Sequence, residues 1–350
     1  MSATLQRVLI TGVTGQDGAL LATRLLREGV AVVGTHRPGV APDTWRLHEL
    51  GVAHHPGLTV APLDSLDAQA CAGLITRSVP EAVFHLAGQS SVAESFRDPV
   101  GSVRANGVGT LNLLEAVRAN APEAHFVLAS SAEIFGAPDV APQNEATPLA
   151  ATTPYGLSKL LAHSAVAAWR ASFGLRASCA ILFNHESEWR DTAFVTRKLS
   201  RGAARIALGR EESIALGNLE ARRDFGYAPD YVAAMRAMAV REHGDDFVLA
   251  TGQACSIRDY ACAVFAAAGI TLDWFGDGFD EVGVERGSDR VCVRIDPALF
   301  RPSDAPLLIG DAAKARDELG FAPSLDVAGL AQRMVEADLR RERATMAGAR

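Results

Sequence analysis

A tyrosine and a lysine four residues apart could carry acid–base chemistry in this chain. They stand in Pro154-Tyr155-Gly156-Leu157-Ser158-Lys159, and residues four apart share one face of a helix. A lysine ammonium close to a tyrosine favours the phenolate and brings the pKa of the tyrosine towards working pH. Ser131 ends an apolar run and can hydrogen-bond the substrate oxygen that Tyr155 deprotonates. We predict Ser131, Tyr155 and Lys159 as catalytic residues.

A glycine-rich turn follows the first apolar run of the chain. It reads Thr11-Gly12-Val13-Thr14-Gly15-Gln16-Asp17-Gly18 and leads into an apolar helical pattern. Glycines let the backbone approach a pyrophosphate, and a helix N-terminus presents N–H groups and the positive end of its dipole. The turn therefore predicts a dinucleotide site. Its expected cofactor contacts are Gly12, Thr14, Gly15, Gln16, Asp17 and Gly18, with Tyr155 and Lys159 added from the catalytic pair.

The residue after the second predicted strand chooses between NAD and NADP. An acidic residue there would hydrogen-bond the ribose 2′-hydroxyl, but this chain reads Gly34-Thr35-His36-Arg37. An arginine can hold a 2′-phosphate in a bidentate fork. The alternative for Arg37 is a solvated surface side chain. The pattern favours NADP.

The elements that must position these residues alternate between strands and helices in the first half. We expect strands at 7–12, 30–35, 58–62, 82–86, 126–130 and 177–183, and helices at 16–28, 106–118 and 160–173. Such alternation predicts right-handed βαβ units and a parallel sheet covered on both faces. The second half is less regular. It has expected helices at 194–208 and 230–240, strands at 213–216 and 247–250, loops at 276–287 and 297–306, and a frayed tail at 339–350.

We therefore predict an α/β fold with a doubly wound parallel Rossmann sheet and a smaller discontinuous α+β domain. Residues 1–183, with 226–250 returning to them, form the mainly NADP-binding domain. Residues 184–225 and 251–345 form the mainly substrate-binding domain. The ligand is expected between them, at the carboxyl edge of the sheet.

Composition excludes several classes of function. The net charge of −7 over 350 residues argues against nucleic acid as the main partner, because phosphate backbones bind to basic faces. Five cysteines without a C-x-x-C pair argue against a metal site or a disulfide framework and fit the cytoplasm. No apolar stretch reaches the ~18 residues of a membrane helix, so no membrane partner is expected. The pair His54-His55 is interpreted as surface.

These motifs resemble the extended short-chain dehydrogenase/reductases, and longer segments resemble the GDP-mannose 4,6-dehydratases. The resemblance runs from Arg7 to about Leu339 and implies an NADP-dependent lyase that converts a GDP-sugar to its 4-keto-6-deoxy form with internally recycled NADP. The segments that carry it are Thr14–Gly18, Asn184–Ser187, Phe194–Lys198, Leu216–Gly226, Asp230–Val232, Phe300–Asp304 and Gly310-Asp311.

The resemblance also implies roles for individual residues. Glu133 matches the carboxylate that removes the C5 proton in 4,6-dehydratases. The alternative is a structural role, since related reductases and epimerases also read Ser-Ala-Glu at this place. Arg222 and Arg301 would hold the diphosphate, which suits bidentate arginine. The alternative for each is a salt bridge on a solvated face, and Arg222-Arg223-Asp224 could be paired internally. Further cofactor contacts are implied at Asp64, Leu86, Ala87 and His185, and further substrate contacts at Ser90, Asn184, Val195 and Lys198. A homo-oligomer, either dimer or tetramer, is implied as well.

The chain departs from the family pattern at three places. Ser131, Ala132 and Phe135 stand where the family usually has Thr, Ser and Tyr. The loop Arg37–Pro42 lacks the second arginine and the serine-rich stretch, and Glu188-Trp189-Arg190 replaces Pro-Arg-Arg. Two alternatives stay open. One is a related nucleotide-sugar enzyme, either a reductase such as GDP-4-keto-6-deoxymannose reductase or an epimerase. The other is a non-catalytic NADP-binding protein, against which the intact Tyr155/Lys159 pair argues.

Overall fold

The chain divides into two compact units, which are described separately. The computed structural model describes residues 5–300 and 307–348. The first unit comprises Met1–Phe183, Ala228–Ala250 and Gly310–Ala322, and the second comprises Asn184–Tyr227, Thr251–Ile309 and Pro323–Arg350. The segment Gly310–Ala322, which we expected in the second domain, belongs to the first unit. Hydrogen bonds hold it there, among them those from Asp311 N to Gln143 O at 2.8 Å and from Lys314 Nζ to Asp246 O at 3.0 Å.

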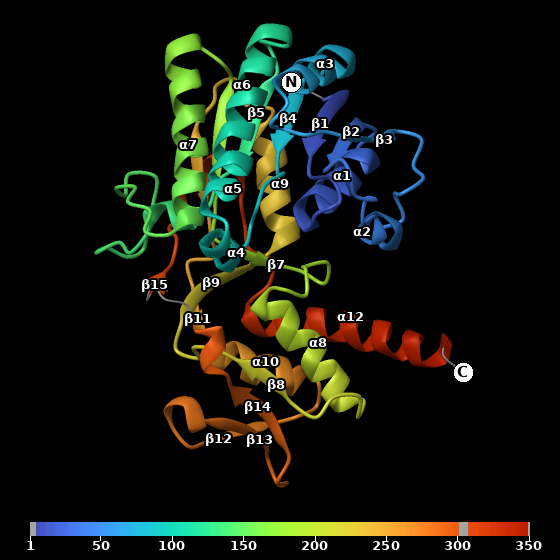
Figure 1. The fold of residues 1–350 in the computed structure, drawn as a ribbon, viewed down its shortest axis with the longest axis vertical. Helices are drawn as coiled ribbons and strands as arrows, with labels where there is room; N and C mark the ends of the chain where they lie inside the picture. The colour runs from blue at the N-terminus through green and yellow to red at the C-terminus, as the bar shows by residue number, and fades with distance from the viewer. Residues whose placement is uncertain (1–4, 301–306, 349–350) are drawn as a thin grey trace. The chain divides into compact units, whose positions relative to one another are not determined.

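A seven-stranded parallel sheet forms the centre of the first unit (Figure 1). Its order, β10-β6-β5-β4-β1-β2-β3, reverses direction between β1 and β4, as in doubly wound folds. Every neighbouring pair is parallel. The strands are β1 (Arg7–Thr11), β2 (Ala31–His36), β3 (Leu58–Pro62), β4 (Ala82–His85), β5 (His125–Ala129), β6 (Ala177–Leu182) and β10 (Asp246–Leu249). The predicted fold class is confirmed.

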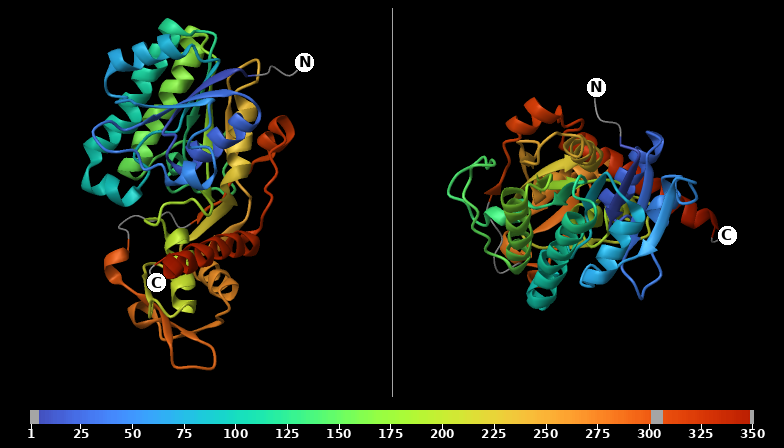
Figure 2. Two further views of the ribbon diagram at one scale, coloured as in Figure 1. Left: turned by 90° about the vertical axis from the view of Figure 1, so that its right-hand side faces the viewer. Right: turned by 90° about the horizontal axis from the view of Figure 1, so that it is seen from above.

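Helices cover both faces of this sheet. On one face α6 and α7 lie side by side (Figures 1 and 2), and α3 completes a core in which Leu74, Val117 and Val166 pack with strand residues such as Phe126. On the other face α1 and α9 pack against each other. The helices are α1 (Gln16–Arg27), α2 (Trp45–Glu49), α3 (Ala68–Ser78), α4 (Val92–Arg97), α5 (Pro99–Val103), α6 (Gly109–Asn120), α7 (Pro154–Phe173), α9 (Ala228–Met238) and α11 (Ala313–Leu319), with a π-helix η1 (Arg104–Val108) and a 3₁₀ turn η2 (Ala132–Phe135).

The second unit contains two small sheets and three longer helices. One sheet has the order β11-β9-β15, with β7 also pairing with β9, and the other has the order β12-β13-β14-β8. Buried Arg197 and Asp338 tie α8 to α12, with Arg197 Nε 2.9 Å from Asp338 Oδ2. The elements are β7 (Asn184–Glu186), α8 (Val195–Ala207), β8 (Ile214–Leu216), β9 (Arg222–Tyr227), β11 (Ala254–Ser256), α10 (Ile257–Ala267), β12 (Leu272–Phe275), η3 (Gly278–Asp280), β13 (Val282–Glu285), β14 (Val291–Ile295), η4 (Pro297–Leu299), β15 (Leu307–Leu308) and α12 (Val327–Gly348).

Three local predictions were wrong. Helix α7 begins at Pro154, not at 160, because the Thr153 hydroxyl caps Gly156 N at 2.9 Å and proline is favoured in a first helical turn. The expected loop at 276–287 contains β13. The tail expected to be frayed forms the end of α12, where buried Glu342 is paired with Arg201 at 3.0 Å and also with Arg205 and Arg210. His54 and His55 are exposed, as expected.

Candidate active site

The parallel sheet gathers the predicted cofactor and catalytic segments of the first unit at one edge. The glycine turn follows β1, Arg37 follows β2, and Asp64 lies shortly after β3. Leu86 and Ala87 follow β4, and Ser131 lies just beyond the end of β5. Because the carboxyl ends of parallel strands meet at the same edge, these predicted residues share that edge with the switch point between β1 and β4.

The glycine turn has the geometry of a dinucleotide-phosphate cradle. Gly12 has φ +75°, and a Cβ at Gly12 would lie 2.9 Å from Ala87 N, so this turn requires glycine. A Cβ at Gly18 would lie 2.2 Å from Gly12 O, which lets α1 start directly against the turn. Gly15 is exposed at the N-cap of α1, and a Cβ there would meet only Gly12 O, at 3.3 Å. The turn therefore fits a pyrophosphate at the helix N-terminus.

The other predicted cofactor residues of this unit vary in exposure. Arg37 and Asp64 are exposed, and Asp64 Oδ1 accepts a hydrogen bond from Leu66 N at 2.9 Å. Thr14, Asp17, Leu86 and Ala87 are half-buried, and Gln16 is buried with its Nε2 3.0 Å from Asp17 Oδ1.

Residues missed from the sequence brace this turn. Buried Arg46 of α2 donates from Nη1 to Thr14 O at 3.2 Å. Thr11 Oγ1 accepts from Ala87 N at 3.1 Å and lies 2.7 Å from His85 Nδ1. Burial, with a smaller effect from Lys159, lowers the pKa of His85 to about 3, so its ring is neutral. His85 stands near the end of the otherwise apolar run 82–86, and a polar residue at that position could have indicated a contact with the turn.

Tyr155 and Lys159 lie in the first turns of α7, as the spacing predicts, and both are buried. Lys159 Nζ is 6.0 Å from the centre of the Tyr155 ring and donates to Ala129 O, at the end of β5, over 2.8 Å. Burial lowers the pKa of Lys159 to about 8, although Asp17 opposes the shift. The ammonium is therefore positioned close to the tyrosine and remains charged at neutral pH.

The turn η2, which contains Glu133 and is capped by Ser131, packs against the start of α7. Ser131 caps this turn, with its Oγ accepting from Glu133 N at 3.3 Å. A Cβ at Gly156 would lie 2.5 Å from Glu133 O, so the glycine next to Tyr155 allows η2 to pack directly on α7. Ser131 is buried and Glu133 is half-buried. Of the four predicted catalytic residues, Ser131 and Glu133 thus lie at the cap and within η2, just after β5, and Tyr155 and Lys159 lie in the first turns of α7.

Asn106 is a further residue that sequence reasoning missed. Its buried side chain donates to Ser158 Oγ at 2.8 Å and to Gln89 O at 3.0 Å, and accepts from Gln89 N at 2.9 Å. It thereby ties the loop after β4 to α7. Asn106 lies in η1, and π-turns often occur at functional sites. The sequence showed only a helical pattern there, with no sign of a π-turn.

The predicted substrate residues divide between the units. Ser90 is exposed in the loop after β4 of the first unit, whereas Asn184, Val195, Lys198 and Arg222 belong to the second unit, as does the predicted cofactor residue His185. Arg301 lies outside the described residues. Asn184 on β7 pairs with Phe225 on β9, the strand that begins with Arg222. Val195 and Lys198, both half-buried, lie in the first turn of α8, and His185 is buried in β7.

Arg222 is placed to meet an anion. It is exposed, and its Nη2 donates to Ala254 O at 3.3 Å. In the described part of the chain it makes no ion pair, because nearby Asp224 instead accepts from Thr251 N and Gly252 N, both at 2.8 Å. The alternative of internal pairing within Arg222-Arg223-Asp224 therefore does not apply to Arg222.

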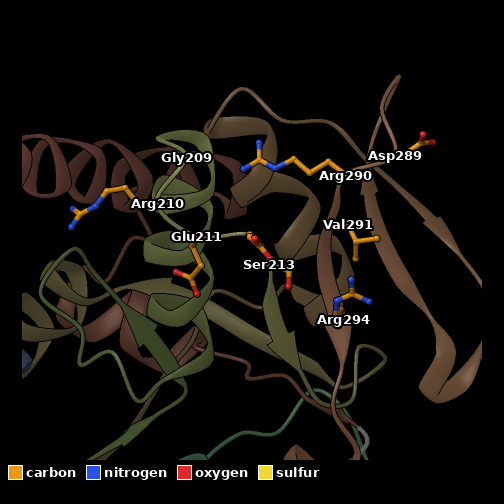
Figure 3. A pocket seen from close by; sticks show the side chains of 9 residues that line it. Gly209, Arg210, Glu211, Ser213, Asp289, Arg290, Val291 and Arg294 are labelled. Carbon is orange, nitrogen blue, oxygen red and sulfur yellow. The ribbon is translucent and has the colours of Figure 1, made fainter.

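Two pockets lie in the second unit. One of about 660 Å³ has Arg210, Glu211, Ser213, Arg290 and Arg294 in its lining (Figure 3) and includes none of the predicted site residues. The other, of about 440 Å³, is lined in part by Asn218, Leu219 and Glu220 of the segment 216–226, and by Phe300, the neighbour of Arg301. The second pocket is thus the one that touches predicted substrate-binding segments.

The glycine turn, the parallel sheet and the Tyr155/Lys159 pair define a short-chain dehydrogenase/reductase fold of the epimerase/dehydratase kind. A family model described as GDP-mannose 4,6 dehydratase matches residues 9–334. The chain belongs to the GDP-mannose 4,6-dehydratase family.

Relatives agree with this assignment, and a solved structure shares the fold. The chain is 40% identical to the GDP-mannose 4,6-dehydratase of Sinorhizobium fredii, over 95% of this chain and 96% of the relative. It is 39% identical to the human GDP-mannose 4,6 dehydratase, over 95% and 91%. A UDP-glucose-4-epimerase from Stenotrophomonas maltophila shares the fold, with a TM-score of 0.80 at 23% identity over 97% of this chain and 99% of that one.

Proposed function

We propose that this protein is a GDP-mannose 4,6-dehydratase-like lyase that converts a GDP-sugar to its 4-keto-6-deoxy form. Membership of the family supports the reaction type. The observation that carries the proposal is the packing of η2 on the start of α7, where the Glu133 backbone oxygen would lie 2.5 Å from a Cβ at Gly156, the neighbour of Tyr155. A reductase needs the tyrosine and the lysine, but a dehydratase also needs a base for the C5 proton.

The side chains of the site have separate tasks in this reaction. Tyr155 accepts the proton of the C4 hydroxyl, Lys159 stabilises the phenolate, and Ser131 hydrogen-bonds the same oxygen. A nicotinamide cofactor held by the glycine turn would supply the hydride acceptor for C4 and the hydride donor for C6. The 4-ketone acidifies the C5 position, so Glu133 can remove that proton as water leaves from C6. The sugar is neither oxidised nor reduced overall.

Glu133→Gln tests the dehydratase step. The variant keeps the shape of the side chain but loses the base, so water loss from GDP-mannose should nearly stop while oxidation at C4 continues. Mass spectrometry of the product measures the water loss, and absorbance measures NADPH. With the parent protein, deuterium placed at C4 should reappear at C6 with no net change in NADPH.

Other results of these measurements would contradict the dehydratase proposal and favour one of its alternatives. If the parent loses no water from any GDP-hexose or GDP-heptose and consumes NADPH with a 4-keto sugar, the protein is a reductase, and Glu133 has only a structural role. Exchange of configuration without water loss would indicate an epimerase. A protein that binds NADP and transforms neither kind of sugar would be non-catalytic.

We infer that the cofactor is NADP, held by the glycine turn and by Arg37, with Asp64, Leu86, Ala87 and His185 as further contacts. The glycine cradle supports a dinucleotide. Arg37 supports the 2′-phosphate, because it is exposed directly after β2. Arg37→Asp should weaken NADP binding by about 1.5–3 kcal/mol, the contribution of a charge-assisted hydrogen bond, and should spare NAD. Calorimetry with both cofactors measures the difference, and equal NADP affinity of parent and variant would remove Arg37 from the site.

The diphosphate of the substrate is assigned to Arg222 and Arg301, with Ser90, Asn184, Val195 and Lys198 as further contacts. Arg222 supports this assignment because it is exposed and makes no ion pair within the described residues.

In the described ranges, no helix is long and apolar enough to cross a membrane. None of the five cysteines forms a disulfide, which supports a cytoplasmic location.

A homo-oligomer is proposed as well. Leu157 on α7 is 54% exposed, and Leu161 on α7 and Val108 on η1 are each 38% exposed. The two elements are in contact, since a Cβ at Gly107 would lie 2.4 Å from Leu161 Cδ2. These three side chains, called here the α7 apolar patch, support a second copy of the chain as the partner.

A further inference from the structure

A histidine that the proposed mechanism does not use lies on the catalytic face of α7. His163 follows Tyr155 by eight residues and Lys159 by four, so the three side chains share one face of the helix. His163 is 6% exposed, and its Nδ1 lies 3.2 Å from the Oγ of Ser130, which is 3% exposed. Ser130 directly precedes Ser131. The histidine therefore contacts the chain segment that carries a catalytic side chain.

An ionised carboxylate fixes the tautomer of this histidine. His163 Nε2 lies 3.7 Å from Asp246 Oδ2, and Arg170 donates two hydrogen bonds of 2.9 Å to the Asp246 carboxylate. Burial opposes ionisation of Asp246, but the hydrogen bond and charge of Arg170 together with His163 lower its pKa overall. Because a carboxylate only accepts, it favours the proton on Nε2 and leaves Nδ1 to accept from the Ser130 hydroxyl.

The surroundings keep the ring neutral. Burial lowers the pKa of His163 more than Asp246 raises it, and Arg170 lowers it further. The remaining titratable neighbour is Cys179, whose Sγ lies 3.9 Å from His163 O and whose thiol pKa is raised well above its ordinary value, chiefly by burial. Lys314 contacts the backbone oxygen of Asp246 at 3.0 Å. These groups together favour an imidazole that accepts one hydrogen bond at a fixed nitrogen.

The same atoms could be considered as metal ligands. Single ligand atoms of His163, Cys179 and Asp246 lie within 4.8 Å of one another. A metal, however, needs a thiolate and free carboxylate oxygens. Here the thiol is held protonated, and both carboxylate oxygens accept hydrogen bonds from Arg170. A hydrogen-bonded network fits these residues better than a metal site.

We propose that His163 is a positioning residue that fixes Ser130 against α7 and so holds Ser131 in register with Tyr155 and Lys159. Two successive residues, Ala129 at the end of β5 and Ser130 directly after it, are each attached to α7, at positions one helical turn apart. Ala129 O accepts from Lys159 Nζ at 2.8 Å, and Ser130 Oγ lies 3.2 Å from His163 Nδ1, where the favoured tautomer lets the hydroxyl donate. The Ser130 backbone is held independently, by a bond of 2.8 Å from its N to Ala180 O. The contact with His163 adds a second attachment of Ser130, from its side chain to α7. This role rests on the proposed function of Ser131, Tyr155 and Lys159.

A pair of substitutions separates the two contacts of His163. His163→Asn places an amide oxygen near the position of Nδ1, so Ser130 keeps an acceptor. His163→Gln reaches towards Asp246 and leaves Ser130 without one. We expect kcat for GDP-mannose to fall roughly tenfold or more in His163→Gln and Ser130→Ala, because small misplacements of reacting groups are costly, with KM unchanged. His163→Asn should keep most of kcat.

The pH profile gives a readout that general loss of stability would not move. A lysine held less firmly beside Tyr155 favours the phenolate less, so the acid limb of kcat should move to higher pH in His163→Gln and stay in place in His163→Asn. Ser130→Ala and His163→Gln combined should lower kcat no further than either alone, since both remove the same bond. Equal kcat and equal profiles in the Asn and Gln variants would overturn the proposal.

The chain offers a matched control at the other end of the same strand. His125 Nε2 and Ser178 Oγ form a buried pair, 2.8 Å apart, at the start of β5 and in β6. Ser178→Ala, at the start of β6 and so at the opposite edge of the sheet from Ser131, removes a buried serine–histidine bond and also the acceptor of Asp245 N at 3.0 Å. It should therefore lower the unfolding temperature at least as much as Ser130→Ala and leave kcat unchanged. If it lowers kcat equally, the effect of Ser130 reflects stability alone.

A measurement without substrate tests the tautomer. With ¹⁵N-labelled histidine and His163→Asn to assign the signal, His163 should be neutral at about pH 7 with the proton on Nε2. A protonated ring, the other tautomer, or a signal that changes on adding Zn²⁺ alone would contradict the network. If Tyr155→Phe keeps turnover, the proposed function fails. If Tyr155→Phe is inactive but His163→Gln is normal, only this inference fails.

Discussion

At the scale of single residues, the charge of Lys159 controls the site. Burial lowers the pKa of Lys159 to about 8, so the free enzyme loses this ammonium on moderate alkalinisation. Since the ammonium stabilises the Tyr155 phenolate, kcat/KM should fall above a midpoint near pH 8. Lys159→Arg keeps its charge at any accessible pH, so its alkaline limb should move up by at least about one pH unit even if its maximum rate is lower. An unchanged limb would mean that another group titrates.

Lys159 also makes the free energy of unfolding depend on pH, in the range between its pKa in the folded protein and its pKa in the unfolded chain. Its folded pKa of about 8 lies below the ordinary value of 10.5, so between these values the unfolded chain binds the proton more tightly. Stability therefore rises with pH across this window, whereas near neutrality the cost of burying the ammonium is constant and Lys159 adds no pH dependence. Tyr155→Phe should leave this behaviour intact and lower turnover by at least about a hundredfold, as expected for loss of a general base.

At the scale of elements, the contact between η2 and α7 depends on the glycine next to Tyr155. A Cβ at Gly156 would lie 2.5 Å from Glu133 O, and backbone cannot move aside as a flexible side chain can. Gly156→Ala should cost about 1–3 kcal/mol, as overpacking does, and should lower kcat by displacing Glu133. Denaturant unfolding and turnover measure the two effects. Gly73→Ala is the control, because a Cβ in α3 would meet only the end of Arg77, at 3.1 Å, and should be neutral or stabilising.

At the scale of the whole molecule, the α7 apolar patch lies on the helix that carries the predicted catalytic residues Tyr155 and Lys159. Leu157 lies between Tyr155 and Lys159 in sequence and is 54% exposed. If a second copy covers the patch, Leu157→Lys should shift the protein towards monomers in light scattering, because a buried ammonium without a partner is costly. Val79→Lys, at a side chain of 55% exposure after α3, should leave the assembly unchanged. A parent protein that is monomeric at all concentrations would contradict the proposed oligomer.

The sequence by itself determined the features that depend on neighbours along the chain. The spacing of Tyr155 and Lys159 follows from helix geometry, the turn at Gly12–Gly18 follows from glycine's backbone freedom, and the alternating runs predict the parallel sheet. Only the tertiary structure decided which distant residues meet. Lys159 bonds Ala129, thirty residues away, and Asn106 bonds Ser158, fifty-two residues away. The attachment of His163 to Ser130 and Asp246 is of the same kind, because such contacts depend on how helices pack on the sheet and leave no periodic signal in the chain.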